Sequence, residues 1–249
     1  MIKLLRSQVY KMFHNSIFWI CMVLTIMSVF FYSGFESMKA ETIANGMSLS
    51  KYYSILFQNY STGLPVLIFC VVFASDDFSY GTVHYYISKG IPRAQYYLSK
   101  MMTCALAATI YVSMAGISGS IISQILWNNL NEISYINLGQ LFFFFLSQIL
   151  LHISYAGFLV FTCFLFRNSV TTSVVNMFLL IFGFLILHKI EEVIWHTYVI
   201  SVYWPVAMFQ RVQVLTVADW FPVVAGIFAI YGLILTFLGI LITKKRDIK

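Results

Sequence analysis

The charged residues most suited to specific chemistry lie in one stretch, residues 75–100. It contains two adjacent carboxylates, Asp76 and Asp77, and basic residues such as Arg93. Adjacent carboxylates can cap a helix or pair with basic groups of another protein. The sequence lacks the phosphate loop G-x-x-x-x-G-K-[ST], the zinc motif H-E-x-x-H and the nucleophile motif G-x-S-x-G. We therefore expect this stretch to bind a partner, and we expect the chain not to be an enzyme.

A second group of polar residues lies inside apolar segments. Gln148 and His152 are four residues apart and share one helix face, and Asn176 falls in the next apolar segment. They fit either a polar lining of a substrate path or hydrogen bonds between packed helices. No Asp, Glu, Lys or Arg lies in the middle of an apolar segment. Transport driven by a proton or sodium gradient usually needs such groups, so we expect any transport to be powered from outside the chain.

The four cysteines all fall in apolar segments. Their spacing fits neither a zinc site nor a disulfide framework, so we expect small buried apolar residues and neither a metal nor another cofactor in this chain. The cysteines are Cys21, Cys70, Cys104 and Cys163.

The composition indicates that membrane helices position these residues. Hydrophobic residues make up 60% of the 249 residues and charged residues only 10%, against about 25% in soluble globular proteins. A spanning helix needs roughly 20 apolar residues. The sequence predicts an all-α membrane protein, one transmembrane domain over residues 1–249 with six spans. The spans are Ser16–Ser33, Tyr60–Ala74 (its helix starting near Ser50), Met101–Trp127, Leu138–Phe166, Val170–Leu187 and Phe221–Thr243.

Charge placement predicts the orientation. With the N-terminus inside, the inner segments hold eleven of the fifteen Lys and Arg, and the outer segments hold six of the nine Asp and Glu. Both termini are therefore expected in the cytoplasm. Because the basic residues lie at the ends of apolar segments, we expect lipid headgroups and a cytoplasmic protein as partners, and no nucleic acid.

The segments outside the spans have patterns of their own. Residues 1–15 place apolar side chains at helical spacing with basic residues elsewhere, which predicts an amphipathic helix in the inner membrane interface. The apolar set is Ile2, Leu5, Val9, Met12 and Phe13.

Residues 75–100 predict a short cytoplasmic helix that Gly90 and Pro92 would end. Lys100 would follow on the next helix, placed for the inner headgroups. The outer segment 188–219 is rich in aromatic residues and predicts either a lid over an exit or a hairpin that seals the bundle.

Small residues in the third span predict a close contact between helices. Ala115 and Gly119, and likewise Gly116 and Ser120, are four residues apart. Such small-xxx-small pairs let helix backbones approach each other. They indicate packing and not a ligand site.

The run from Asp76 to Lys100 resembles the stretch after the second span of bacterial type-2 ABC exporter permeases. It reads acid-acid-Phe-x-x-Gly-Thr, four residues, Ile-Ser-x-x-Ile-x-Arg, and ends Tyr-Tyr-Leu-x-Lys. It departs from the usual pattern at His84, where Lys or Arg is commoner, and at Gly90, where Pro is commoner. The rest of the chain is similar in layout: an interfacial helix, six spans, inner termini and a long last outer segment.

The resemblance implies a permease without its own ATPase. Such a permease pairs with a second permease and with cytoplasmic ATP-binding subunits, which carry ATP and Mg²⁺. Residues 75–100 would dock on the ATPase as a coupling helix, with Gly81 allowing close backbone approach and three aromatic residues filling the partner's groove. The implied coupling residues are Asp76, Asp77, Phe78, Gly81, Thr82, Tyr85, Tyr86 and Arg93.

In size and layout the chain is most similar to the short permeases of bacterial peptide and lantibiotic-type transporters. This similarity implies export of an amphipathic or hydrophobic cargo, such as a peptide, across the bacterial inner membrane, as in resistance to antimicrobial peptides. The alternative is a membrane assembly or regulatory subunit that transports nothing.

Overall fold

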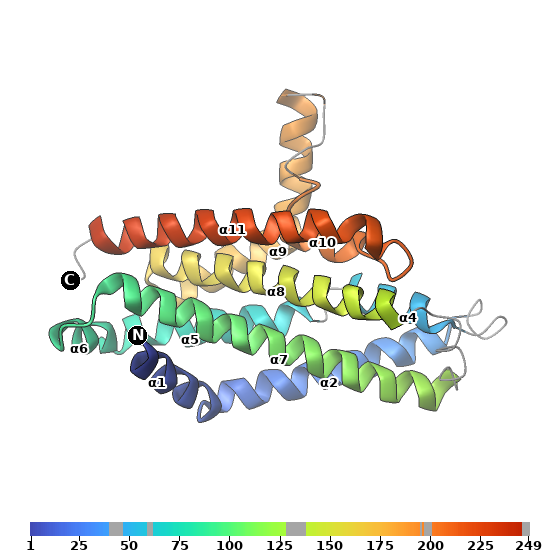
Figure 1. Cartoon of the computed structure of the whole chain (residues 1–249), viewed down its shortest axis with the longest axis horizontal. Coiled ribbons are helices and arrows are strands. Elements are labelled where there is room, and N and C mark those ends of the chain that lie inside the picture. The colour runs from blue at the N-terminus through green and yellow to red at the C-terminus, as the bar shows by residue number, and fades with distance from the viewer. Residues whose placement is uncertain (40–46, 59–61, 128–137, 195, 197–200, 246–249) are drawn as a thin grey trace.

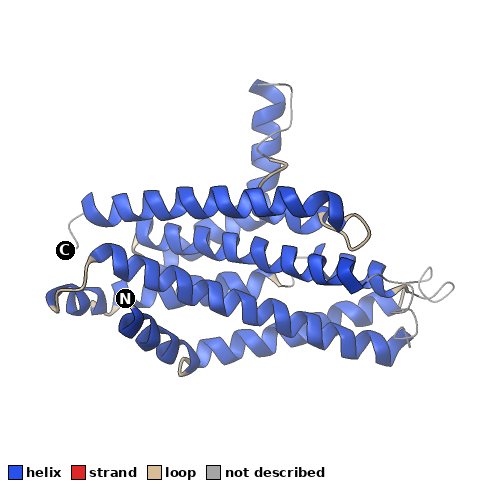
Figure 2. Ribbon diagram, viewed as in Figure 1, coloured by secondary structure: helices blue, strands red, loops and turns tan. Residues whose placement is uncertain are grey.

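The fold is a bundle of long helices in a computed structural model that describes residues 1–39, 47–58, 62–127, 138–194, 196 and 201–245. Every regular element in these ranges is a helix (Figure 2). The helices are α1 (Ile2–Phe13), α2 (Ser16–Ser37), α4 (Leu49–Gln58), α5 (Gly63–Ser79), α6 (Thr82–Ser88), α7 (Arg93–Trp127), α8 (Leu138–Phe166), α9 (Ser169–Ile194), α10 (Pro205–Arg211) and α11 (Val217–Lys245).

Six helical stretches are long and apolar enough to cross a membrane, which confirms the predicted fold class of an all-α membrane protein with six spans. α2, α7, α8, α9 and α11 each form one span, and α4 with α5 forms the second. The predicted ends of the fourth span are those of α8, whereas α7 begins eight residues before the predicted start. α2, α7, α8 and α11 lie roughly alongside one another, whereas part of α9 stands away from them (Figure 1).

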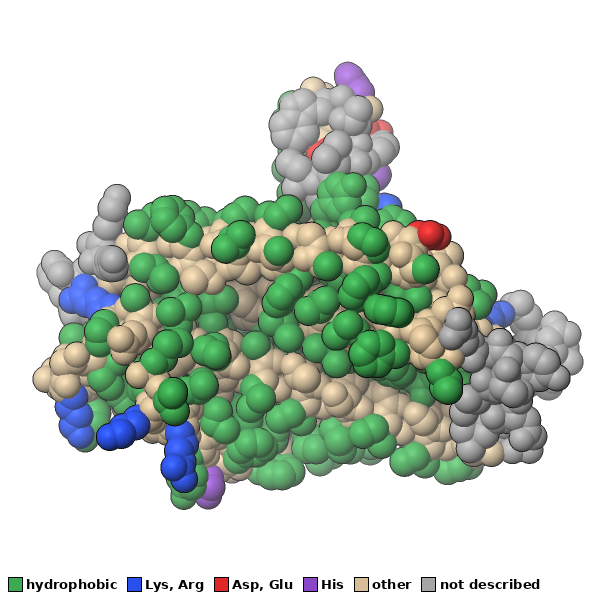
Figure 3. All heavy atoms as spheres, in the orientation of Figure 1, with side chains coloured by type: hydrophobic (Ala, Val, Ile, Leu, Met, Phe, Trp, Pro, Cys, Tyr) green, Lys and Arg blue, Asp and Glu red, His purple; other side chains and the backbone are tan. Residues whose placement is uncertain are grey.

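One end of the bundle carries Met1, the short helix α6 and the end of α11 (Figure 1). We call it the basic end, because Lys and Arg side chains gather there on the face shown in Figure 3. Apolar side chains cover the length of the bundle on the same face. This division is the one expected of a bundle whose sides face lipid and whose basic end faces anionic headgroups.

α1 is the helix predicted for residues 1–15, but it buries a different face. It packs on α7 and α2 through Leu4, Gln8 and Met12, while Ile2 and Phe13 are exposed. The predicted apolar set therefore only borders the buried face: Met12 belongs to both, whereas Ile2 and Phe13 stay exposed. The Asn15 side chain accepts a hydrogen bond from the Ile17 N–H at 2.9 Å and caps α2.

The small residues of α7 are at close helix contacts, as predicted. A Cβ added at Gly116 would lie 2.6 Å from the Phe145 ring of α8, and one at Gly119 would lie 3.0 Å from Leu56 of α4. Both distances are shorter than ordinary carbon–carbon contact. The pairs therefore serve packing within the chain.

The second span is built from two helices, α4 and α5, as the predicted early start near Ser50 required. Residues 59–61 between them lie outside the described part of the chain, so the Tyr60 boundary of the prediction cannot be compared. Thr62 precedes α5 and is fully buried. The break brings a buried hydroxyl group to the interior of the bundle.

The segment predicted as outer, residues 188–219, contains the end of α9, all of α10 and the start of α11. The C-terminal part of α9 stands out from the side of the bundle (Figure 1), and its Glu191 accepts a hydrogen bond from the Ser201 N–H at 2.9 Å. α10 is buried instead, packed on α8, α4 and α9. Its Met208 and Phe209 are at most 2% exposed, so this part of the segment is built into the bundle.

Candidate functional site

The segment that joins the second and third spans lies at the basic end. α5 ends at Ser79, α6 covers seven residues, and α7 begins at Arg93. Gly81 and Gly90 flank α6 with φ angles of +66° and +80°, a conformation that favours glycine. In the described part of the chain, a Cβ built on Gly81 would meet no heavy atom within 4 Å beyond its two chain neighbours. Within its own chain, Gly81 is needed for the left-handed turn into α6. Close approach of another backbone, the role predicted for Gly81, would have to come from a partner.

Asp77 is buried inside its own chain. One carboxylate oxygen accepts hydrogen bonds from Lys11 of α1 and, at 3.0 Å, from the Thr82 hydroxyl of α6. The other accepts from the Tyr96 hydroxyl and lies 2.6 Å from the Lys100 ammonium, both on α7. We call these five residues the Asp77 clasp. Four groups of the chain thus occupy both oxygens of Asp77, one of them the Thr82 hydroxyl at the start of α6, so that pairing of Asp77 with a partner's basic groups stays a prediction.

Lys100 departs from expectation. The sequence placed it among lipid headgroups, but its side chain is fully buried. Its ammonium also donates to the Phe73 carbonyl at 3.1 Å and lies 3.9 Å from the centroid of the Phe73 ring. Because α7 starts two turns before the predicted span, Lys100 lies within the helix bundle and needs the Asp77 carboxylate as its counter-charge.

The aromatic residues of this segment divide into an inward and an outward set. Phe78 packs on Phe164, with ring centroids 5.0 Å apart, and Tyr86 packs on Tyr96 at 5.4 Å, so both are half-buried contacts with the chain itself. Tyr85 is 56% exposed, as expected of a docking residue. The Lys89 ammonium lies over its ring at 4.1 Å.

The remaining coupling residues occupy the same region. Asp76 is half-buried beside Asp77, and Arg93 is half-buried as the first residue of α7. Tyr80, which sequence reasoning did not single out, is 79% exposed. His84 and Tyr85 on α6 are exposed as well, and so is Lys89 directly after it. We call Tyr80, His84, Tyr85 and Lys89 the α6 face. The local sequence signal for Tyr80 is the glycine that follows it, since a glycine between two helical stretches marks a turn at the surface.

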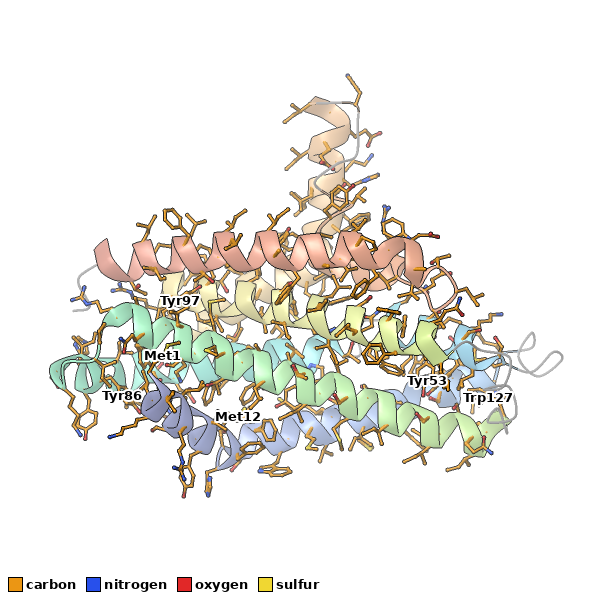
Figure 4. The ribbon with its side chains drawn as sticks, viewed as in Figure 1. Met1, Met12, Tyr53, Tyr86, Tyr97 and Trp127 are labelled. Atoms are coloured by element: carbon orange, nitrogen blue, oxygen red, sulfur yellow. The ribbon has the colours of Figure 1, made fainter. Side chains whose placement is uncertain are left out.

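Aromatic residues lie at both ends of the bundle. Tyr86 lies at the basic end, whereas Tyr53 and Trp127 lie at the opposite end (Figure 4). The rings of Tyr52 and Trp127 are 5.5 Å apart, and the Tyr53 hydroxyl lies 2.5 Å from the Ser120 hydroxyl. Aromatic residues thus mark the end of the bundle that was predicted to be outer, as membrane-interface residues do.

His152 is fully buried among three elements. Its Nδ1 lies 2.7 Å from the Gln148 carbonyl oxygen and its Nε2 lies 2.9 Å from the Thr62 hydroxyl. A carbonyl oxygen only accepts, so Nδ1 carries the proton, and Nε2 of the neutral ring accepts from Thr62. The ring stacks on Phe209 of α10, with centroids 4.3 Å apart. His152 therefore holds α5, α8 and α10 together.

Asn176 does not form one patch with Gln148 and His152. The Asn176 amide donates to the Thr162 hydroxyl at 2.7 Å and to the Thr172 carbonyl at 2.9 Å. Thr162 is ten residues beyond His152 on α8, about 15 Å along the helix axis. For Asn176 and His152 the structure thus favours hydrogen bonding between packed helices. The side chain of Gln148 is fully buried, and neither of its amide atoms has a hydrogen-bond partner in the part of the chain that the structure describes.

An apolar groove of about 210 Å³ runs between α7, α8 and α11. Met101, Ile153, Gly157 and Leu235 are among its lining residues. Its walls offer almost no hydrogen-bonding groups, so it can hold a hydrocarbon chain but cannot orient a polar ligand.

The four cysteines are buried and unpaired, as predicted. Among residues 1–39, 47–58, 62–127 and the later described ranges, no group of three or more His, Cys, Asp or Glu is placed to hold a metal ion. The chain also matches no known protein-family model and no curated protein. The local geometry therefore carries the functional argument.

Proposed function

We propose that this chain is the transmembrane permease subunit of an ATP-driven exporter of the type-2 ABC class. The observation that carries the proposal is α6, a short helix between two left-handed glycines that presents the α6 face at the basic end of a six-span bundle. Of the seven residues of this helix, Val83 alone is buried. The helix is well suited to contact a protein below the membrane.

The energy source in this proposal is a separate cytoplasmic ATP-binding subunit, which supplies ATP and Mg²⁺. The sequence has no phosphate loop of its own, and a permease of this class needs none. The basic end then faces the cytoplasm of a bacterial cell, in agreement with the concentration of positive charge near that end. The long sides of the bundle face inner-membrane lipid.

The working unit in this proposal is a pair of permeases, either two copies of this chain or this chain with a similar one. The cargo is amphipathic or hydrophobic, such as a peptide. The apolar groove and the scarcity of charge along the bundle support this cargo class, because a path with few polar groups passes apolar side chains at little desolvation cost. Of the three polar residues predicted for a substrate path, Gln148 is the one best suited to contact cargo, because both atoms of its amide lack a partner in the described chain.

Within the coupling segment, the roles of the residues divide between docking and support. The α6 face carries the docking contacts, with Arg93 and Asp76 at its border. Phe78, Thr82 and Tyr86 support α6 from beneath. A regulatory subunit that transports nothing would share the fold, but it would not require cargo-stimulated ATP hydrolysis.

The test is to purify the affinity-tagged chain from membranes of its native host and to measure MgATP hydrolysis in the purified sample. We expect ATPase activity to co-purify and to be lost when Tyr80 and Tyr85 are both replaced by Ala. Tyr10→Ala is the matched control, because Tyr10 is 64% exposed at the same end but lies on α1. Absence of ATPase activity with the wild-type chain would refute the proposal. Equal recovery in the double variant would show that docking lies elsewhere.

A further inference from the structure

Asp77 is buried where four helices meet. It belongs to α5, and its donors come from α1 (Lys11), α6 (Thr82) and α7 (Tyr96 and Lys100). An ionised carboxylate offers about four acceptor positions, and here four donors fill them. The carboxylate therefore binds the chain's own helices to one another.

The two lysines of the Asp77 clasp differ in what they would do without the carboxylate. The Lys11 side chain is 39% exposed and can be hydrated. Lys100 is fully buried, and Asp77 is the acid within ion-pair distance of it in the described chain. Separating Lys100 from Asp77 would leave an unpaired ammonium in the interior, which is strongly unfavourable, so we expect this ion pair to persist. Lys11 adds the N-terminal helix to this pair.

A glycine turn connects α6 to its neighbour at each end. The helix is joined to α5 through Gly81 and to α7 through Gly90, both in the left-handed region. The Thr82–Asp77 hydrogen bond spans the first of these turns. Val83 is the buried side chain of α6, and Tyr86 packs on Tyr96, itself a donor to Asp77. Two contacts of α6 thus lead to the same carboxylate, one from Thr82 directly and one from Tyr86 through Tyr96.

We propose that the Asp77 clasp makes α1, α6 and α7 move as one body, so that a displacement of α6 is passed to the N-terminal helix and to the longest span. Asp77 is then a positioning residue and not a docking residue. The proposal rests on the proposed function only in naming an ATPase as the source of the displacement.

The test measures the distance between α1 and α6 in the full chain, purified in lipid nanodiscs. Spin labels are attached at Ser7→Cys and Ser88→Cys, both exposed positions, and the native cysteines are buried. We expect a single narrow distance distribution. The variant Asp77→Asn with Lys100→Met removes both charges and leaves no unpaired buried ammonium, so it keeps the protein folded while opening the clasp. We expect it to lose the narrow peak.

Asp76→Asn is the control for the aspartate position, because it makes the Asp77→Asn replacement one residue away, outside the clasp. We expect it to keep the narrow distribution. A narrow distribution in the double variant, or a broad one in the wild-type chain, would overturn the proposal. In the complex with its ATPase, the double variant should keep wild-type ATPase recovery but transport less cargo for each ATP hydrolysed. If no ATPase co-purifies with the wild-type chain, the proposed function fails, whereas the spin-label distances still decide whether the clasp exists.

Discussion

Replacing Gly239 by Ala should destabilise the protein, although alanine is the better helix former. Gly239 is buried on α11 where it meets Tyr97 of α7. A Cβ at Gly239 would lie 2.1 Å from the Tyr97 ring and 2.3 Å from its hydroxyl oxygen. The ring would have to move by more than 1 Å to restore ordinary contact distances of about 3.5 Å.

Tyr97 has little room to make that movement. It lies between α7 and α11 (Figure 4), is fully buried, and packs edge-on against Phe164 with centroids 5.0 Å apart. Its hydroxyl donates to the Leu235 carbonyl at 2.9 Å. Overpacking costs about 1–3 kcal/mol and loss of this hydrogen bond about 1 kcal/mol, while the helix propensity of alanine returns up to about 1 kcal/mol. The net loss in the free energy of unfolding should be about 1–3 kcal/mol.

The assay is thermal unfolding in mild detergent, in which each kcal/mol corresponds to roughly 2–4 °C in the midpoint for a chain of this size. Gly232→Ala is the matched control, since Gly232 is on the same helix and no heavy atom lies within 4 Å of its Cβ position. It should leave the midpoint unchanged or raise it. In a Tyr97→Leu background, the cost of Gly239→Ala should disappear. A Gly239→Ala protein as stable as wild type would refute the packing at this contact.

Two further predictions test the site and the orientation. Gln148→Leu removes a buried amide without partners and should raise the free energy of unfolding by about 1–3 kcal/mol, measured by the same thermal unfolding. If Gln148 also lines the cargo path, transport should fall in this more stable variant. Unchanged transport would show that Gln148 has no role in cargo passage. Single cysteines at Ser88 and Ser48, both exposed, should react with a membrane-impermeant thiol reagent from the inside and the outside of cells respectively, and the reverse pattern would contradict cytoplasmic termini.

The spans were predictable because hydropathy depends on sums over many residues. The limits of α8 agree at both ends, and α2 begins at the predicted Ser16. The short helix before Gly90 and the close contacts of Gly116 and Gly119 also followed from local residue types. In each case the physical signal lies within one helix turn or one apolar segment.

The Asp77 clasp could not be predicted, because its ion pairs join residues far apart in the sequence. Lys11 precedes Asp77 by 66 positions, and Lys100 follows it by 23. A lysine at the end of an apolar segment is normally hydrated or at a headgroup, so Lys100 gave no sign of burial. The same limit applies to the aromatic residues: nothing local distinguishes the exposed Tyr85 from the half-buried Tyr86 that follows it. Their roles depend on which side of α6 faces Tyr96.

The length of α7 has a mechanical consequence. Its 35 residues form a rod of about 52 Å, and the close contacts at Gly116 and Gly119 lie nearer its far end. From Arg93 to Gly116 is about 35 Å and from Gly119 to Trp127 about 12 Å. If α7 tilts as a rigid rod about this contact, it is a lever with unequal arms. A shift at the basic end then reaches the other end in the opposite direction, reduced about threefold in distance and increased about threefold in force.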